Sequence, residues 1–147
     1  MLLAFCEAFR KGDAKGIEKQ LQKYLAKTIS IRDTAVRKNY KENFYHGLLL
    51  GLLSFKDTWG ISSNKETGEG YSDILVEIPE EEIGIIIEVK YAENGDMDAG
   101  CKEALNQTLD RRYEEYFYDG GMQRILKYGI ACYKKRCQVA LDNEAKF

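Results

Sequence analysis

Two acidic residues and a lysine are the side chains in this sequence best suited to chemistry. Glu88 and Lys90 follow the apolar run Ile83–Ile87 and are separated by a single residue. In a β-strand, residues i and i+2 project from the same face, so these two side chains lie side by side. Asp73 lies in the preceding strand-like segment, and an antiparallel hairpin turning at residues 79–82 places it opposite Glu88. The pattern therefore brings two carboxylates and a lysine together.

This set of side chains suits metal-assisted phosphodiester hydrolysis. Two carboxylates held close in an apolar sheet repel each other unless a proton or a cation lies between them. A hard divalent cation such as Mg²⁺ accepts oxygen ligands from both and keeps several waters. Lys90 can then steady an attacking water or neutralise charge that grows on a phosphate. Acyl transfer fits poorly, because the one histidine, His46, has no serine or cysteine beside it in a recognisable arrangement.

The elements that must hold these residues are predicted from periodicity. Helical spacing predicts a helix over residues 1–10, a second helix capped by Asp13, and a third over residues 35–54 capped by Asp33 or Thr34. It also predicts one continuous helix over residues 97–118, with Asp96 or Asp98 near its start. Strands are predicted at residues 59–64, 71–78, 83–90, 125–133 and 137–141. The fold class is therefore α/β, with a central mixed β-sheet of four or five strands flanked by α-helices.

Length and composition limit the function classes. The chain has 147 residues, 44% of them hydrophobic, which suits one ordinary folded domain. Its net charge of −2 gives no general attraction to nucleic acid, so any such binding needs a local patch. We expect no membrane segment and no signal peptide, because the most apolar stretch, residues 48–55, is short and the first residues lack a basic region. Four cysteines without a Cys-x-x-Cys pair argue against zinc and favour reduced thiols in the cytoplasm.

The pattern of Asp73, Glu88 and Lys90 resembles the D…E-x-K signature of the PD-(D/E)XK nuclease superfamily. More closely, the chain is similar to the nuclease-like domain found C-terminal to an AAA-ATPase-like domain in uncharacterised bacterial and archaeal proteins. The likeness covers residues 39–139, and the parts that carry it are, in order, residues 42–53, 63–73, 84–90 and 104–107, Tyr113, and residues 127–131. The resemblance implies a restriction-endonuclease-like fold over residues 34–147, preceded by an N-terminal helical extension at residues 1–33.

The resemblance also implies a metal site. Asp73 and Glu88 would hold Mg²⁺, with Mn²⁺ as a substitute, and the carbonyl of Val89 would be an extra ligand. Glu42, on the predicted helix over residues 35–54, falls where the superfamily often keeps another acidic residue that binds the metal directly or through water.

Two further residues complete the implied catalytic set. Lys90 would orient the nucleophilic water, and Gln107 falls where family members keep a polar residue near the site.

The function implied is a Mg²⁺-dependent nuclease that hydrolyses DNA phosphodiesters through a metal-activated water. The alternative is a catalytically inactive nuclease-fold module that serves in protein interaction or regulation, and the near-neutral charge favours it. The chain contains no G-x-x-x-x-G-K-[ST] loop, so an ATPase domain would be a separate partner. A homodimer is also compatible with the resemblance, since related nucleases often dimerise to cut two strands.

Three groups of residues leave alternatives open. His46 could touch the site or a phosphate, or simply be hydrogen-bonded within the helix packing. A cluster of aromatic side chains could stack on bases or belong to the core, namely Tyr113, Tyr116, Phe117 and Tyr118. Basic side chains could form a phosphate-contacting surface or be ordinary solvated charges, namely Arg111, Arg112, Arg124, Lys127 and the turn at residues 134–136.

Overall fold

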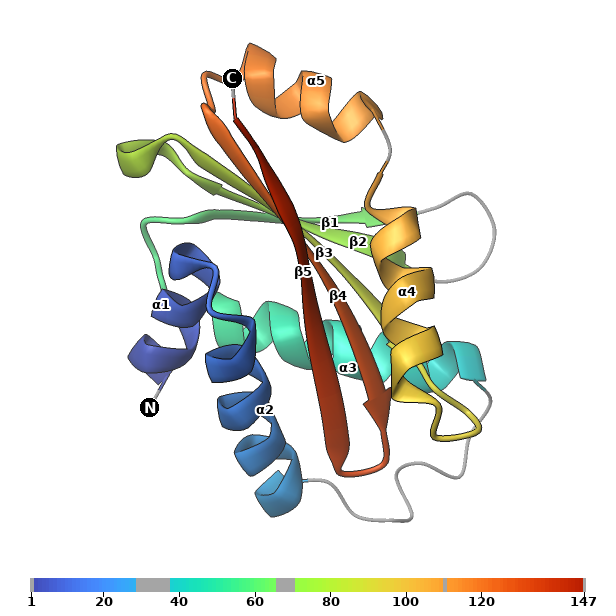
Figure 1. Ribbon diagram of the computed structural model, residues 1–147. Helices are drawn as coiled ribbons and strands as arrows, with labels where there is room; N and C mark the ends of the chain where they lie inside the picture. Colours follow the sequence, from blue (N-terminus) through green and yellow to red (C-terminus); the bar gives the residue numbers. More distant parts are fainter. Residues whose placement is uncertain (1, 29–37, 66–70, 110, 147) are drawn as a thin grey trace.

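A five-stranded mixed sheet forms the centre of the protein (Figure 1). The structure, a computed structural model, describes residues 2–28, 38–65, 71–109 and 111–146. The strands lie in sequence order, with β3 and β4 parallel and every other neighbouring pair antiparallel. They are β1 (Gly60–Lys65), β2 (Tyr71–Ile78), β3 (Ile83–Tyr91), β4 (Arg124–Tyr133) and β5 (Arg136–Lys146). The predicted α/β class with a central mixed sheet is confirmed.

Helices cover both faces of this sheet. One face carries α1 (Leu2–Lys11), α2 (Ala14–Thr28) and α3 (Lys38–Leu53), and the other carries α4 (Met97–Gln107) and α5 (Arg111–Asp119) (Figure 1). A short 3-10 helix, η2 (Pro79–Glu81), turns the chain from β2 to β3. The predicted cap Asp13 is confirmed, since its Oδ1 accepts the main-chain N–H of Gly16. Of the two residues expected near the start of the later helix, Asp96 is the cap, and its Oδ1 accepts the N–H of Ala99. The capping residues expected at 33 and 34 lie outside the described residues.

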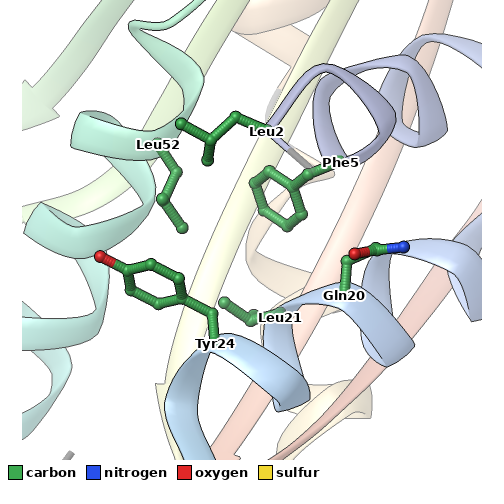
Figure 2. Close-up of a pocket in the computed structure, with 6 residues that line it drawn as sticks. All are labelled: Leu2, Phe5, Gln20, Leu21, Tyr24 and Leu52. Atoms are coloured by element: carbon green, nitrogen blue, oxygen red, sulfur yellow. The ribbon is translucent and has the colours of Figure 1, made fainter. Parts of the chain in front are cut away.

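The larger core lies between the sheet and the first three helices. Alternate residues of β3, such as Ile85 and Ile87, point into it, which explains why the strand is apolar on this face. A small apolar pocket marks the place where the three helices meet (Figure 2). Figure 2 shows side chains from all three helices facing one another there: Leu2, Phe5, Gln20, Leu21, Tyr24 and Leu52. The first two helices are thus packed into the same core as α3.

The helix predicted over residues 97–118 is in fact two helices, so that prediction is wrong. Helix α4 ends at Gln107, and the hydroxyl of Thr108 donates to the carbonyl of Leu105. A straight helix of this length would extend about 33 Å. The break instead redirects α5 so that Phe117, which is fully buried, packs onto β3 at Gly84, where an added Cβ would come within 2.6 Å of the ring. Packing on the sheet therefore overrides the continuous helical periodicity.

Helix α4 makes direct backbone contact with β4 at Gly129. A Cβ at this position would lie 2.8 Å from the carbonyl oxygen of Cys101 and the amide nitrogen of Leu105. Gly129 is also the register partner of Glu88, so this contact sets the distance of α4 from the sheet beside that carboxylate.

We therefore expect Gly129→Ala to destabilise the protein by about 1–3 kcal/mol, because helix backbone cannot move aside as a side chain can. Urea unfolding followed by circular dichroism measures the change. Gly47→Ala is the matched control, since a Cβ there meets no atom within 4 Å, and it should be neutral or slightly stabilising. Equal effects of the two substitutions would contradict this account of the α4 contact.

The four cysteines are buried free thiols, as expected for a chain with reduced cysteines. Over the described parts of the chain, no helix has both the length and the apolar character needed to cross a membrane. The expected boundary between residues 33 and 34 lies outside the described residues, so the division into an extension and a domain stays a prediction.

Candidate active site

Asp73 and Glu88 face each other across β2 and β3. They form the last pair of the ladder between these strands, which is the predicted register. Their neighbours Ile74 and Ile87 point into the core beneath α3, so both carboxylates point to the opposite face, which α4 and α5 cover. Asp73 is 2% exposed and Glu88 is 1% exposed. The sheet therefore holds two buried carboxylates on one face.

Lys90 projects from the same face as Glu88. Its Nζ lies 3.7 Å from Glu88 Oε1, and its side chain is 14% exposed. The ammonium group thus lies at the rim of the site, between the buried carboxylates and solvent. A cation in this position can reach both a carboxylate and an incoming anionic group.

Beyond this last pair, β3 continues to Tyr91 without β2 as a partner. The N–H of Ala92 donates to the carbonyl of Cys132 on β4, whereas the N–H of Tyr91 donates to Glu42 Oε2 at 3.0 Å. Main-chain groups alternate in direction along a strand, so the carbonyl of Val89 faces the same side as the Tyr91 N–H. That carbonyl therefore faces the side on which the two strands part.

The electrostatics of Glu88 reflect its burial. Burial raises the pKa of Glu88 to about 11, and the adjacent Asp73 carboxyl adds to the increase while Lys90 opposes it. Its Oε2 atom is buried and has no hydrogen-bond partner among the described residues. Glu88 therefore binds a proton at neutral pH when no cation is near, and a divalent ion between the carboxyls would take the place of that proton.

Tyr113 holds the other carboxylate. This residue lies on α5, is 9% exposed, and donates a hydrogen bond from its hydroxyl to Asp73 Oδ2. Helix α5 is itself fixed to the sheet by Glu114, whose Oε1 lies 2.5 Å from the Nζ of buried Lys127. The docking of α5 therefore fixes the orientation of Asp73.

Glu42 and His46 approach the site from α3. The carboxylate of Glu42 caps the free N–H of Tyr91, and its charge contributes to the raised pKa of Glu88. His46 is buried, and its Nε2 lies 2.8 Å from Ser63 Oγ on β1. Burial lowers the pKa of His46, whereas the nearby charge of Asp73 acts in the opposite direction. His46 is thus hydrogen-bonded within the packing and lies within electrostatic reach of the site.

Gln107 and Lys127 differ in their surroundings from the buried pair. Gln107 is exposed at the last residue of α4 and makes no hydrogen bond with the described residues. Lys127 is buried in its ion pair with Glu114, so it is not part of a solvated basic surface. Among the aromatic residues Phe117 belongs to the core, whereas Tyr116 is 51% exposed.

Sequence reasoning missed the partners of the site residues. The sequence indicates Tyr113 as a core or base-stacking residue that also falls within the family likeness, whereas its bond to Asp73 joins positions 40 residues apart. No local spacing indicates such a contact. The Tyr-rich segment and the family likeness at Tyr113 are the available signals, and neither assigns a partner to its hydroxyl.

The side chains and main-chain groups of this site suit the binding of a hard divalent cation that takes few protein ligands. The fit rests on two facing carboxylates, the buried Glu88 Oε2 atom without a partner, and the Val89 carbonyl directed to the same region. In the described part of the chain, no group of three or more His, Cys, Asp or Glu side chains is arranged to hold a metal. A set of two carboxylates suits Mg²⁺, which usually keeps several waters, and does not suit zinc.

The fold and the buried pair together define an α/β protein with an acidic, lysine-flanked site suited to metal-assisted phosphoryl chemistry. The family model of the PD-(D/E)XK nuclease superfamily matches residues 40–141, and the chain therefore belongs to this superfamily. No curated protein and no solved structure matches the chain. The expected restriction-endonuclease-like fold is confirmed by this match and by the five-stranded mixed sheet.

Proposed function

We propose that this protein hydrolyses phosphodiester bonds in DNA with the help of Mg²⁺. Membership of the nuclease superfamily supports phosphodiesterase chemistry in general. The observation that carries the proposal for this chain is the buried pair of Asp73 and Glu88 with Lys90 3.7 Å from the Glu88 carboxylate. The group lies on one face of the sheet, and its lysine lies near solvent.

In this proposal Asp73 and Glu88 bind the metal, and the Val89 carbonyl supplies a third oxygen. Glu42 lies on the same side as that carbonyl and acts directly or through a water. A bound Mg²⁺ would supply Lewis-acid charge that stabilises the phosphorane-like transition state and lowers the pKa of water. Mn²⁺ prefers the same carboxylate, carbonyl and water ligands and can replace it.

Lys90 acts on the reacting groups. Its ammonium group orients the attacking water by hydrogen bonding and neutralises charge that develops on the phosphate oxygens. Tyr113 fixes the Asp73 carboxylate from α5, so less ordering is needed when the metal binds. Gln107 remains a predicted polar residue for the substrate side, supported by the family resemblance.

A catalytically inactive nuclease-fold module is the second candidate. One observation favours it: several site residues already have protein partners, since Tyr113 donates to Asp73, Lys90 pairs with Glu88, and Glu42 caps a main-chain N–H. A protein that only presents this fold to a partner would need no metal and would show no hydrolysis.

Hydrolysis of a supercoiled plasmid and of a labelled oligonucleotide tests the choice. We expect nicking that requires Mg²⁺ or Mn²⁺, stops with EDTA, and is lost in Asp73→Asn, which keeps the side-chain size and removes the charge. Glu103→Gln, an exposed carboxylate on α4, is the control for loss of one negative charge. Activity that survives EDTA or Asp73→Asn would contradict the proposed mechanism, and no activity with any metal would favour the inactive module.

We also propose a cytoplasmic location, which four free cysteines support, because such thiols persist in a reducing compartment. Association with an AAA-ATPase-like domain and formation of a homodimer follow from the family resemblance alone. Co-purification with a candidate ATPase and measurement of the solution mass by light scattering test these two proposals.

A further inference from the structure

Two hollows lie near the buried carboxylates in the part of the chain that the structure describes. The first follows Lys90 along the chain, where the end of β3 meets the first half of α4. The second lies between β1, β2 and α5. We call the second hollow the α5 groove, and the residues that line it are Ser62, Ser63, Leu75, Arg112, Tyr113 and Tyr116.

Charge distinguishes the two hollows. Among the described residues, the first is lined by three carboxylates, Glu93, Asp96 and Glu103, and by no basic side chain. The described residues that line the α5 groove include Arg112 and no carboxylate. A polyanionic strand is repelled by the first hollow and attracted by the second.

The α5 groove is continuous with the site through two of its lining residues. The hydroxyl of Tyr113 donates to Asp73, and Ser63 is hydrogen-bonded to His46. Leu75 projects from the same face of β2 as Asp73, two residues further on. A chain lying in the groove therefore contacts Tyr113, the residue that is hydrogen-bonded to the carboxylate proposed to bind the metal.

We propose that the α5 groove binds the stretch of nucleic-acid strand next to the scissile phosphate. The inference rests on the proposed function and specifies how the substrate reaches the site. Arg112 binds a backbone phosphate, and the ring of Tyr116 stacks on the neighbouring base or sugar.

The environment of Tyr116 suits stacking. Half of the residue is exposed, which leaves a ring face open to the groove. Its hydroxyl is hydrogen-bonded to Glu77, and its ring lies edge-on to the buried ring of Phe117, with ring centres 5.5 Å apart. An exposed ring held at both ends loses little freedom when a base packs on it. Glu77 contacts the outer end of this ring.

A DNA-binding measurement tests the proposal. Fluorescence anisotropy reports the binding of a fluorescein-labelled 12-nucleotide DNA strand, and every protein carries Lys90→Met to prevent hydrolysis. Arg112→Gln and Tyr116→Ala should each raise Kd at least about fivefold, and Arg112→Gln should lower the salt dependence by about one ion. One control should bind like the parent: Lys102→Gln, which removes the same charge from an exposed position on α4.

Thermal melting with and without Mn²⁺ distinguishes failure of the groove proposal from failure of the proposed function. We expect the Mn²⁺-induced rise in Tm to persist in Arg112→Gln and Tyr116→Ala, because neither residue is proposed to bind metal. Parent-like binding of DNA by both variants would overturn the role of the groove and leave the proposed function standing. Absence of DNA binding by the parent itself would overturn the proposed function and, with it, the role of the groove.

Discussion

Lys90→Met should lower the rate of DNA hydrolysis by about 100- to 1000-fold, the usual cost of removing one preorganised group that stabilises transition-state charge. Methionine keeps the length and apolar stem of the lysine, which is largely buried. The substitution removes the ammonium group that lies 3.7 Å from Glu88. The rate is measured with saturating Mg²⁺ on a labelled duplex under single-turnover conditions.

Metal binding distinguishes this catalytic role from a structural one. We expect Lys90→Met to keep the Mn²⁺-induced rise in Tm, since Asp73 and Glu88 remain. Lys90→Arg restores the charge but not the shape, and it should recover only part of the rate. A Lys90→Met protein with nearly full activity would remove this residue from the chemistry, whereas loss of the Mn²⁺ effect would mean that Lys90 mainly supports the metal site.

Glu88→Gln should stabilise the metal-free protein while it abolishes metal-dependent stabilisation and hydrolysis. At neutral pH the unfolded chain carries an ionised Glu88, whereas burial and Asp73 raise the pKa of the folded carboxyl from 4.5 to about 11. Folding must therefore take up a proton, which costs free energy. Glutamine has nearly the shape of the protonated acid and avoids this cost. We expect a gain of at least ~1 kcal/mol at pH 7, or about 4 °C in Tm.

The pH dependence of Tm in EDTA checks the sign of this effect. The pKa of Glu88 is higher in the folded protein than in the unfolded chain. The stability of the parent, compared with that of Glu88→Gln, should therefore be greatest at and below about pH 4.5. The parent should then lose stability as the pH rises toward about 11. The difference between the two proteins should grow steadily across this window. Parallel pH profiles would mean that Glu88 ionises freely in the folded protein, which would contradict the burial account.

The placement of Asp73 opposite Glu88 could be predicted from the sequence because strand geometry is local. The side-chain period of two and the short loop at residues 79–82 favour the register that pairs Asp73 with Glu88, because the hairpin then turns within that loop. The apolar character of β3 on both faces likewise indicated a central strand, and its acidic interruption indicated a site. Each of these signals needs only neighbouring residues.

The features that could not be predicted depend on contacts between distant segments. The break between α4 and α5 follows from the packing of Phe117 on Gly84, which is 33 positions earlier by residue number. The hydrogen bond from Tyr113 to Asp73 depends on that same docking. Glu42 was predicted from resemblance as an acidic site residue, but its contact with the N–H of Tyr91 exists only because β2 leaves β3 at this point.

The claim that Asp73 and Glu88 share one metal ion is tested most directly by isothermal titration calorimetry. The experiment compares Mn²⁺ binding to the parent and to Asp73→Asn in the absence of nucleic acid. The account predicts that the parent binds Mn²⁺ with release of protons, because the ion displaces the proton held by Glu88. It predicts that Asp73→Asn, folded as judged by circular dichroism, binds at least about tenfold more weakly. Equal affinity in the two proteins, or no binding by the parent at millimolar Mn²⁺, would contradict the claim that Asp73 and Glu88 share one metal ion.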